Sequence, residues 1–162
     1  MAELLRRSAP IPARQGEGRS HLQTLDETLC PPGRRVTSRA GVVLDAGIFI
    51  AVERRQRPAV ALTQLLVDSD TPMVTSAGVV AQVWRDGTGR QVPIAYLLKH
   101  TNVVPLEYGT ARLIGRVLGQ TGSRDPIDAH VVLLARQRGW PVITSDPDDL
   151  LAIDPTLHVE RI

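Results

Sequence analysis

Val42-Val43-Leu44-Asp45-Ala46-Gly47 is the stretch of sequence that decides the fold. Its three apolar residues, two of them β-branched, are typical of a short strand that is buried on both faces. The run ends at an aspartate, which two small residues follow. Strands buried in this way belong to parallel sheets that helices cover on both sides, so an α/β fold is expected.

Outward from this stretch, short apolar runs alternate with segments of helical periodicity. Further strands are predicted at residues 73–75, 103–106, 142–144 and 158–159. Helices are predicted at residues 58–67, from 76 to about 87, and at 92–98, 108–118 and 127–138. The alternation predicts an α/β/α sandwich of three layers around a short, mainly parallel sheet.

Residues 1–40 differ from the remainder of the chain. They contain seven Arg, four acidic residues, four Pro and three Gly, and they show no sustained period. We expect a disordered or weakly structured N-terminal extension, with short helical stretches near 2–8 and 21–29. Residues 41–162, with twelve basic and thirteen acidic residues, are expected to form one domain. The excess of positive charge thus belongs to the extension.

Several classes of protein are disfavoured by composition. No apolar run approaches the roughly 18 residues of a membrane span, and no apolar stretch follows Arg6 and Arg7 as in a secretory signal. Cys30 is the only cysteine, which excludes an internal disulfide and a cysteine metal site. These features fit a protein of the reducing cytoplasm.

Acidic and amide side chains recur where strands are expected to end. Asp45 closes the first strand, Gln82 lies in the helix after the second, Asp125 and Asp128 open the helix 127–138, and Asp146 follows the strand 142–144. The carboxyl ends of parallel strands meet at one edge of the sheet, where ligands bind. Carboxylates gathered there would repel one another and raise their pKa values, and a divalent cation removes that cost.

A structural interpretation competes with this metal site. Asp125-Pro126-Ile127-Asp128 has the form of a helix start, with an N-cap residue, proline at the first position and an acid at the third. Asp146-Pro147-Asp148-Asp149 has the same form, and each motif alone favours capping. Asp45 has no such clear capping role, so the three sites together favour metal binding.

Four motifs in this order resemble the PIN domain family, over about residues 41–162. They are Val42–Gly47, Val79–Arg85, Asp125–Ala135 and Val142–Leu150. The most similar group is the VapC-type ribonuclease toxins of type II toxin–antitoxin systems. The resemblance implies an Mg²⁺- or Mn²⁺-dependent endoribonuclease that cuts single-stranded or loop RNA, forms a homodimer and is held by a cognate antitoxin.

The resemblance also assigns roles to residues. Asp45, Asp128 and Asp146 match the family's catalytic acids and metal ligands, with Asp125 a helper ligand and Asp149 a possible second acid. Gln82 stands where the family usually has a glutamate, and a neutral amide lowers affinity for a cation. The alternative is therefore a degenerate, non-catalytic PIN module that binds RNA or a protein, unless Asp86 substitutes.

Three arginines are candidate substrate contacts. Arg85 lies near Gln82, and Arg112 and Arg116 lie one turn apart on one helix, where guanidinium groups can bind phosphate. A solvated face or an antitoxin contact explains them equally well. A metal-dependent phosphatase of another α/β family is disfavoured, because such enzymes place a second aspartate two residues after the first and this chain has Gly47 there.

Overall fold

A five-stranded sheet forms the centre of the computed structural model, which describes residues 40–85 and 89–162. Every strand is parallel to its neighbours, in the order β3-β2-β1-β4-β5. The strands are β1 (Val42–Leu44), β2 (Met73–Ser76), β3 (Thr101–Val104), β4 (Val142–Thr144) and β5 (Val159–Arg161). The predicted parallel sheet is confirmed.

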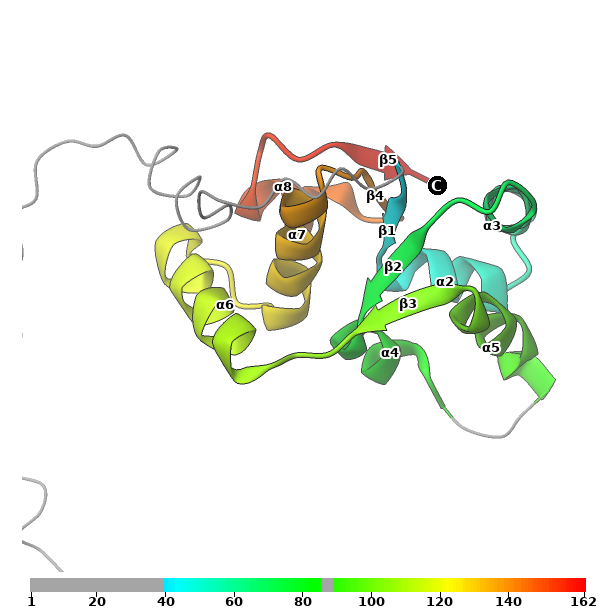
Figure 1. Cartoon of the computed structure of the whole chain (residues 1–162), viewed down its shortest axis with the longest axis horizontal. Coiled ribbons are helices and arrows are strands. Elements are labelled where there is room, and N and C mark those ends of the chain that lie inside the picture. Colours follow the sequence, from blue (N-terminus) through cyan, green and yellow to red (C-terminus); the bar gives the residue numbers. More distant parts are fainter. Residues whose placement is uncertain (1–39, 86–88) are drawn as a thin grey trace, which may run out of the picture.

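Helices cover both faces of this sheet (Figure 1). One face carries α7 with α6 and α8, and the other carries α2, α3 and α5, while α4 follows β2 at the carboxyl edge. The helices are α2 (Ala46–Glu53), α3 (Arg57–Asp68), α4 (Ala77–Val83), α5 (Val92–Lys99), α6 (Tyr108–Thr121), α7 (Pro126–Arg138) and α8 (Pro147–Ile153), with a short 3₁₀ helix η1 (Gly89–Gln91). The three predicted layers are confirmed.

Helix α7 is the central helix of its layer. Residues Ala129 to Ala135 are all buried, because the helix lies between the sheet on one side and α6 and α8 on the other. Asp125 caps its start, and Gly139, with a left-handed φ of 66°, ends it as predicted. This fixed frame holds the first turn of α7 at the carboxyl edge of the sheet.

Several elements differ from the sequence prediction: α8 was foreseen only as a helix start at Asp146, and α2 and β3 differ most. Helix α2 was not predicted, because Gly47, Ile48, Phe49, Ala51 and Val52 are all buried and leave no polar face to reveal a helical period. Strand β3 was predicted at 103–106 and lies at 101–104. Pro105 has no N–H to donate to a ladder, so the pairing with β2 stops before it.

Some predictions fall outside the described residues. The N-terminal extension as far as residue 39, its two short helices and Asp86 all lie there. Among the helices that the structure describes, none combines the length and the apolar character needed to cross a bilayer.

Candidate active site

Thr144 links two of the predicted acids at the carboxyl edge. The register pairs Leu44 with Ile143, so that Asp45 and Thr144 follow as neighbours at the ends of β1 and β4. The Thr144 hydroxyl donates to Asp45 Oδ2 at 2.7 Å, and the Asp146 N–H donates to Thr144 Oγ1 at 3.0 Å. Asp45 is only 9% exposed. This threonine therefore holds the buried carboxylate in one orientation and fixes the turn that carries Asp146.

The capping interpretation holds for one acid and fails for two. Asp125 Oδ1 accepts from the N–H groups of Ile127 and Asp128, at 2.7 and 3.2 Å, and so caps α7. Asp45 and Asp146 occupy the N-cap positions of α2 and α8, and neither makes a side-chain cap bond. Their carboxylates are thus not committed to ending a helix.

The pKa of Asp128 responds to the negative charge at this edge of the sheet. Burial first, and then the negative charges of Asp125, Asp45, Asp149 and Asp146 in that order, together raise its pKa from 3.8 to about 7. In the part of the chain that the structure describes, none of these five acids has an ion-pair partner. The predicted repulsion between carboxylates is therefore present at Asp128, and no described Lys or Arg forms an ion pair with these acids.

A hollow of about 420 Å³ lies against this cluster. Its lining includes Asp125 and Asp128 of the α7 start, Asp149 of α8 and Arg124 from the preceding loop. Sequence analysis did not select Thr144 or Arg124. Thr144 could have been found from its place at the end of a buried strand, whereas no motif marks Arg124.

A close backbone approach brings α2 against the turn after β4. A Cβ atom on Gly47 would lie 2.3 Å from Ser145 Oγ and 2.6 Å from Ser145 N, which no real side chain tolerates. Only glycine permits this contact. The absence of an aspartate at position 47, which argued against a phosphatase, thus has a steric reason.

The donor set at this edge suits a hard divalent cation. Carboxylate oxygens are the ligands that Mg²⁺ and Mn²⁺ prefer, and the uncompensated charge around Asp128 favours a cation. Within the described residues, no three His, Cys, Asp or Glu side chains form a closed ligand set as they stand. The residues therefore fit the ion in chemistry and in charge, and their roles as catalytic residues and metal ligands stay a prediction.

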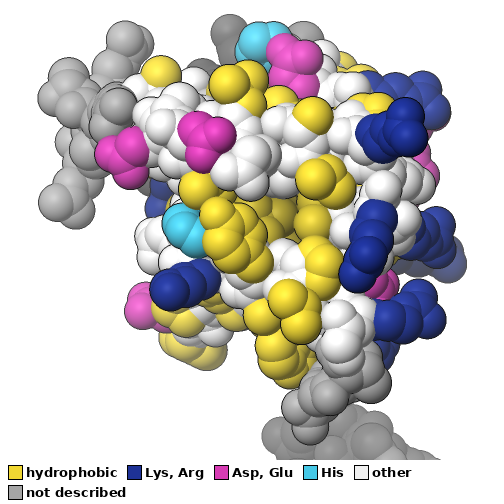
Figure 2. Space-filling view, turned by 90° about the vertical axis from the view of Figure 1, so that its right-hand side faces the viewer, with side chains coloured by type: hydrophobic (Ala, Val, Ile, Leu, Met, Phe, Trp, Pro, Cys, Tyr) yellow, Lys and Arg dark blue, Asp and Glu magenta, His cyan; other side chains and the backbone are white. Residues whose placement is uncertain are grey.

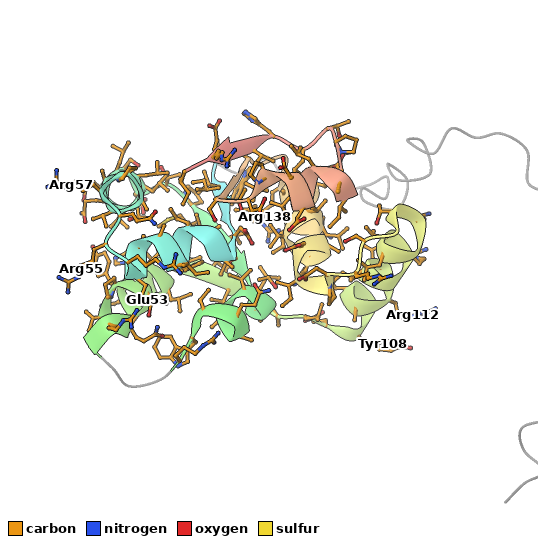
Figure 3. All side chains as sticks on the ribbon, turned by 180° about the vertical axis from the view of Figure 1, so that it is seen from behind. Glu53, Arg55, Arg57, Tyr108, Arg112 and Arg138 are labelled. Atoms are coloured by element: carbon orange, nitrogen blue, oxygen red, sulfur yellow. The ribbon has the colours of Figure 1, made fainter. Side chains whose placement is uncertain are left out.

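The other predicted site residues lie around the cluster without touching it. Gln82 is half-buried on α4 and makes no hydrogen bond to another described residue. Exposed Arg85 donates to the carbonyl oxygen of Trp84 at 2.9 Å. On α6, Arg112 and Arg116 line a separate hollow of about 310 Å³, and the Arg112 guanidinium lies 5.9 Å from the Tyr108 ring centroid (Figure 3).

His130 has a structural role in the domain. It is buried, and its Nδ1 lies 2.8 Å from the hydroxyl of Ser76, which also caps α4 by accepting from the Gly78 N–H. Burial and the charge of Arg138 lower the pKa of His130, so its imidazole is neutral. This pair connects α7 to the end of β2.

Comparison with known proteins adds a family and a set of folds. The family model described as PIN domain matches residues 42–154. One curated relative, the heat-inducible transcription repressor HrcA of Novosphingobium aromaticivorans, is 31% identical over 111 residues, which are 64% of this chain and 31% of that protein. The chain thus spans about a third of the length of this curated relative.

Solved structures with a similar fold come from protein complexes. The FitAB complex bound to the IR36 DNA fragment has a TM-score of 0.52 at 19% identity, over 74% of this chain and 94% of that one. VapBC2 from Rickettsia felis, bound to a DNA fragment from its promoter, has a TM-score of 0.56 at 15% identity, over 75% and 98%. FitAcB from Neisseria gonorrhoeae has a TM-score of 0.50 at 20% identity, over 73% and 95%. At these identities the likeness is one of fold.

Proposed function

This chain belongs to the PIN domain family, and from that premise we propose that it is a metal-dependent endoribonuclease that cuts single-stranded or loop RNA. Proteins of this family are generally nucleases. The observation that carries the proposal is the set of uncompensated carboxylates around Asp128, at the carboxyl edge of a parallel sheet and beside an open hollow. Such an edge is where α/β folds bind their ligands.

In this proposal Asp45, Asp128 and Asp146 hold Mg²⁺ or Mn²⁺, and Asp125 contributes the carboxylate oxygen that does not cap α7. The ion would polarise a phosphoryl oxygen and offset the charge that develops during cleavage. The chain's own residues set the geometry, since Thr144 orients Asp45 through a 2.7 Å hydrogen bond. A cluster carboxylate would orient the attacking water, and Arg124 can contact a phosphate in the hollow.

The three predicted phosphate contacts keep that role in the proposal. Arg112 and Arg116 lie exposed on one face of α6, where they can follow an RNA backbone away from the acidic hollow. Arg85 lies at the end of α4, close in sequence to Gln82. Their guanidinium groups would reduce the repulsion between an RNA backbone and the acidic edge.

We also propose that the protein is the toxin of a toxin–antitoxin pair. The similar folds of the VapBC2 and FitAB complexes support this proposal. A small antitoxin would bind the protein and block the acidic edge, the toxin would be a homodimer, and both would act in the cytoplasm. A gene for a short DNA-binding protein directly upstream, whose product co-purifies with this chain, is the expected observation.

The test is cleavage of a fluorescent loop-containing RNA by the purified full chain. We expect cleavage with Mg²⁺ or Mn²⁺, none with EDTA, and a loss of about 100-fold or more in Asp45→Asn. Asp148→Asn is the matched control, because Asp148 is exposed and its charge does not act on Asp128. Folded protein that never cleaves, or equal rates in wild type and Asp45→Asn, would refute the enzyme proposal.

The second candidate is a non-catalytic PIN module that binds RNA or a protein partner. It is favoured by the neutral Gln82 on α4 and by the open arrangement of the acids. Retained RNA binding without metal-dependent cleavage, measured by fluorescence anisotropy in the same preparations, would support this candidate.

A further inference from the structure

Another open hollow lies away from the acids, between α3 and α5. Its walls include Arg57, Val60, Gln64 and Val67 of α3 and Tyr96 and Leu97 of α5, and its volume is about 620 Å³. We call this hollow the α3–α5 groove. Figure 2 shows apolar side chains gathered across this face, with Lys and Arg along one side.

The groove is apolar and yet open to solvent. Val60 is 41% exposed and Tyr96 is 47% exposed, although each contributes an apolar surface that burial would favour. An open apolar hollow of this size on a small domain marks a binding surface.

One end of the groove is basic. Arg55 has a left-handed φ of 56° in the tight turn between α2 and α3, and its side chain lines the groove beside that of Arg57 (Figure 3). Neither arginine has an ion-pair partner among the described residues, and no described residue that lines the groove is acidic. The groove therefore suits a segment with one apolar face and acidic side chains.

The chain carries such a segment before the first strand. In His21–Cys30, the residues Leu22, Leu25 and Leu29 recur at helical spacing, and Asp26 and Glu27 follow the second leucine. A helix over these residues would place the three leucines on one face, with Asp26 at its border.

The point where this segment joins the domain lies near the groove. Val42 N–H donates to Pro72 O at 2.9 Å, and a Cβ atom on Gly41 would lie 2.4 Å from the same oxygen, so the entry of the chain is fixed beside Pro72. Pro72 follows the groove residue Val67 by five positions. The stretch from Leu29 to Ala40 can span roughly 36 Å when extended, and α3 is about 18 Å long. The tether therefore reaches the whole groove.

We infer that residues 21–30 of this chain dock in its own α3–α5 groove. The leucines contact Val60, Val67 and Tyr96, and Asp26 pairs with the basic end at Arg57. Because the tether is short, the effective concentration of the segment at the groove is in the millimolar range, so modest affinity suffices for occupancy. This inference does not depend on nuclease activity.

Cys30 makes the inference testable in the full chain. As the only cysteine, it accepts a nitroxide spin label one residue after Leu29. We expect the amide signals of Ala61, Gln64 and Val67 to lose about half of their intensity or more, relative to the same sample after reduction with ascorbate. The amide signals of Arg138 and Gly139, which lie outside the groove, should keep their full intensity.

Two pairs of substitutions provide the specificity test. Leu22→Asp with Leu25→Asp should restore the groove signals, whereas Gln23→Asp with Thr24→Asp, which adds equal charge off the leucine face, should not. Unchanged groove signals in the wild type, or attenuation that survives loss of the leucines, would overturn the inference. Attenuation of isotope-labelled Cys30→Ser protein by added spin-labelled chain would also overturn it, since the segment would then come from a second copy.

Discussion

Two acidic regions of this domain share residue types and differ in their partners. Asp154, which ends α8, is 4% exposed and lies 3.2 Å from Arg136 Nε, while its Oδ1 accepts from the N–H and hydroxyl of Thr156 at 3.0 and 2.7 Å. Asp128 is less buried, has no such cation, and lies among four other negative charges. The first acid is satisfied and contributes to the fold. The second is held in an unfavourable state, which is typical of a functional site.

The largest effect is expected from a substitution that removes the ion pair between Asp154 and Arg136. Asp154→Ala leaves the Arg136 guanidinium without its carboxylate and removes both bonds to Thr156. We expect the free energy of unfolding in urea to fall by about 3 kcal/mol. Cleavage per folded molecule should be unchanged, and an equal loss of cleavage and stability would show that the two regions are not separate.

The next prediction concerns Asp128, where a substitution should raise the free energy of unfolding instead of lowering it. The pKa of Asp128 rises from 3.8 to about 7 on folding, so the native state holds its proton more tightly than the unfolded chain. The contribution of Asp128 to stability is therefore most favourable below about pH 4 and is lost as the pH rises to about 7. Asp128→Asn removes this penalty, and we expect it to gain about 2 kcal/mol at pH 8 while cleavage is lost. Urea titrations at pH 5 and pH 8 check the result, and a loss of stability at pH 8 would contradict it.

A smaller effect is expected from a substitution that changes the orientation of the Asp45 carboxylate and leaves its charge in place. Thr144→Val keeps the shape of the strand end and removes the hydroxyl that donates to Asp45. We expect the free energy of unfolding to fall by about 1–2 kcal/mol and cleavage to fall about tenfold. Thr144→Ser, which restores the donor, is the control. If both variants behave alike, the hydroxyl does not orient Asp45.

The smallest effect is expected from a substitution that adds a negative charge near the acids around Asp128. Gln82→Glu restores the side chain that the PIN family usually has, and we expect cleavage with Mg²⁺ to rise about tenfold. In EDTA the same variant should lose about 0.5–1 kcal/mol of stability, because it adds to the repulsion. Gln56→Glu, an exposed change at the α2–α3 turn, controls for added charge. No change in cleavage would show that position 82 lies outside the site.

The sequence predicted the layers because buried strands and capped helices leave local signals. Asp125 and Gly139 mark the two ends of α7, and the motif around Asp45 marks β1. Helix α2 was not predicted because its residues before Glu53 are all apolar or small, so no polar face marks a helical period. Strand β3 was predicted two residues too late in the chain, since the effect of Pro105 on strand pairing depends on which neighbour β3 has.

The candidate site was predicted in outline and not in detail. A parallel sheet brings its strand ends to one edge, so the approach of Asp45, Asp128 and Asp146 follows from topology alone. The Thr144 bond, the turn at Gly47 and the Arg124 side chain depend on register and close packing, which residue spacing does not encode. The α3–α5 groove arises from two helices that pack apart from each other, and no single motif describes it.

The hydrogen bond between Thr144 and Asp45 joins residues 99 positions apart, across almost the whole domain. During synthesis the first acid leaves the ribosome long before the residue that orients it. A nascent or prematurely ended chain therefore exposes no assembled acidic edge until β4 pairs with β1. The order of translation thus delays the appearance of the site until the domain is nearly complete.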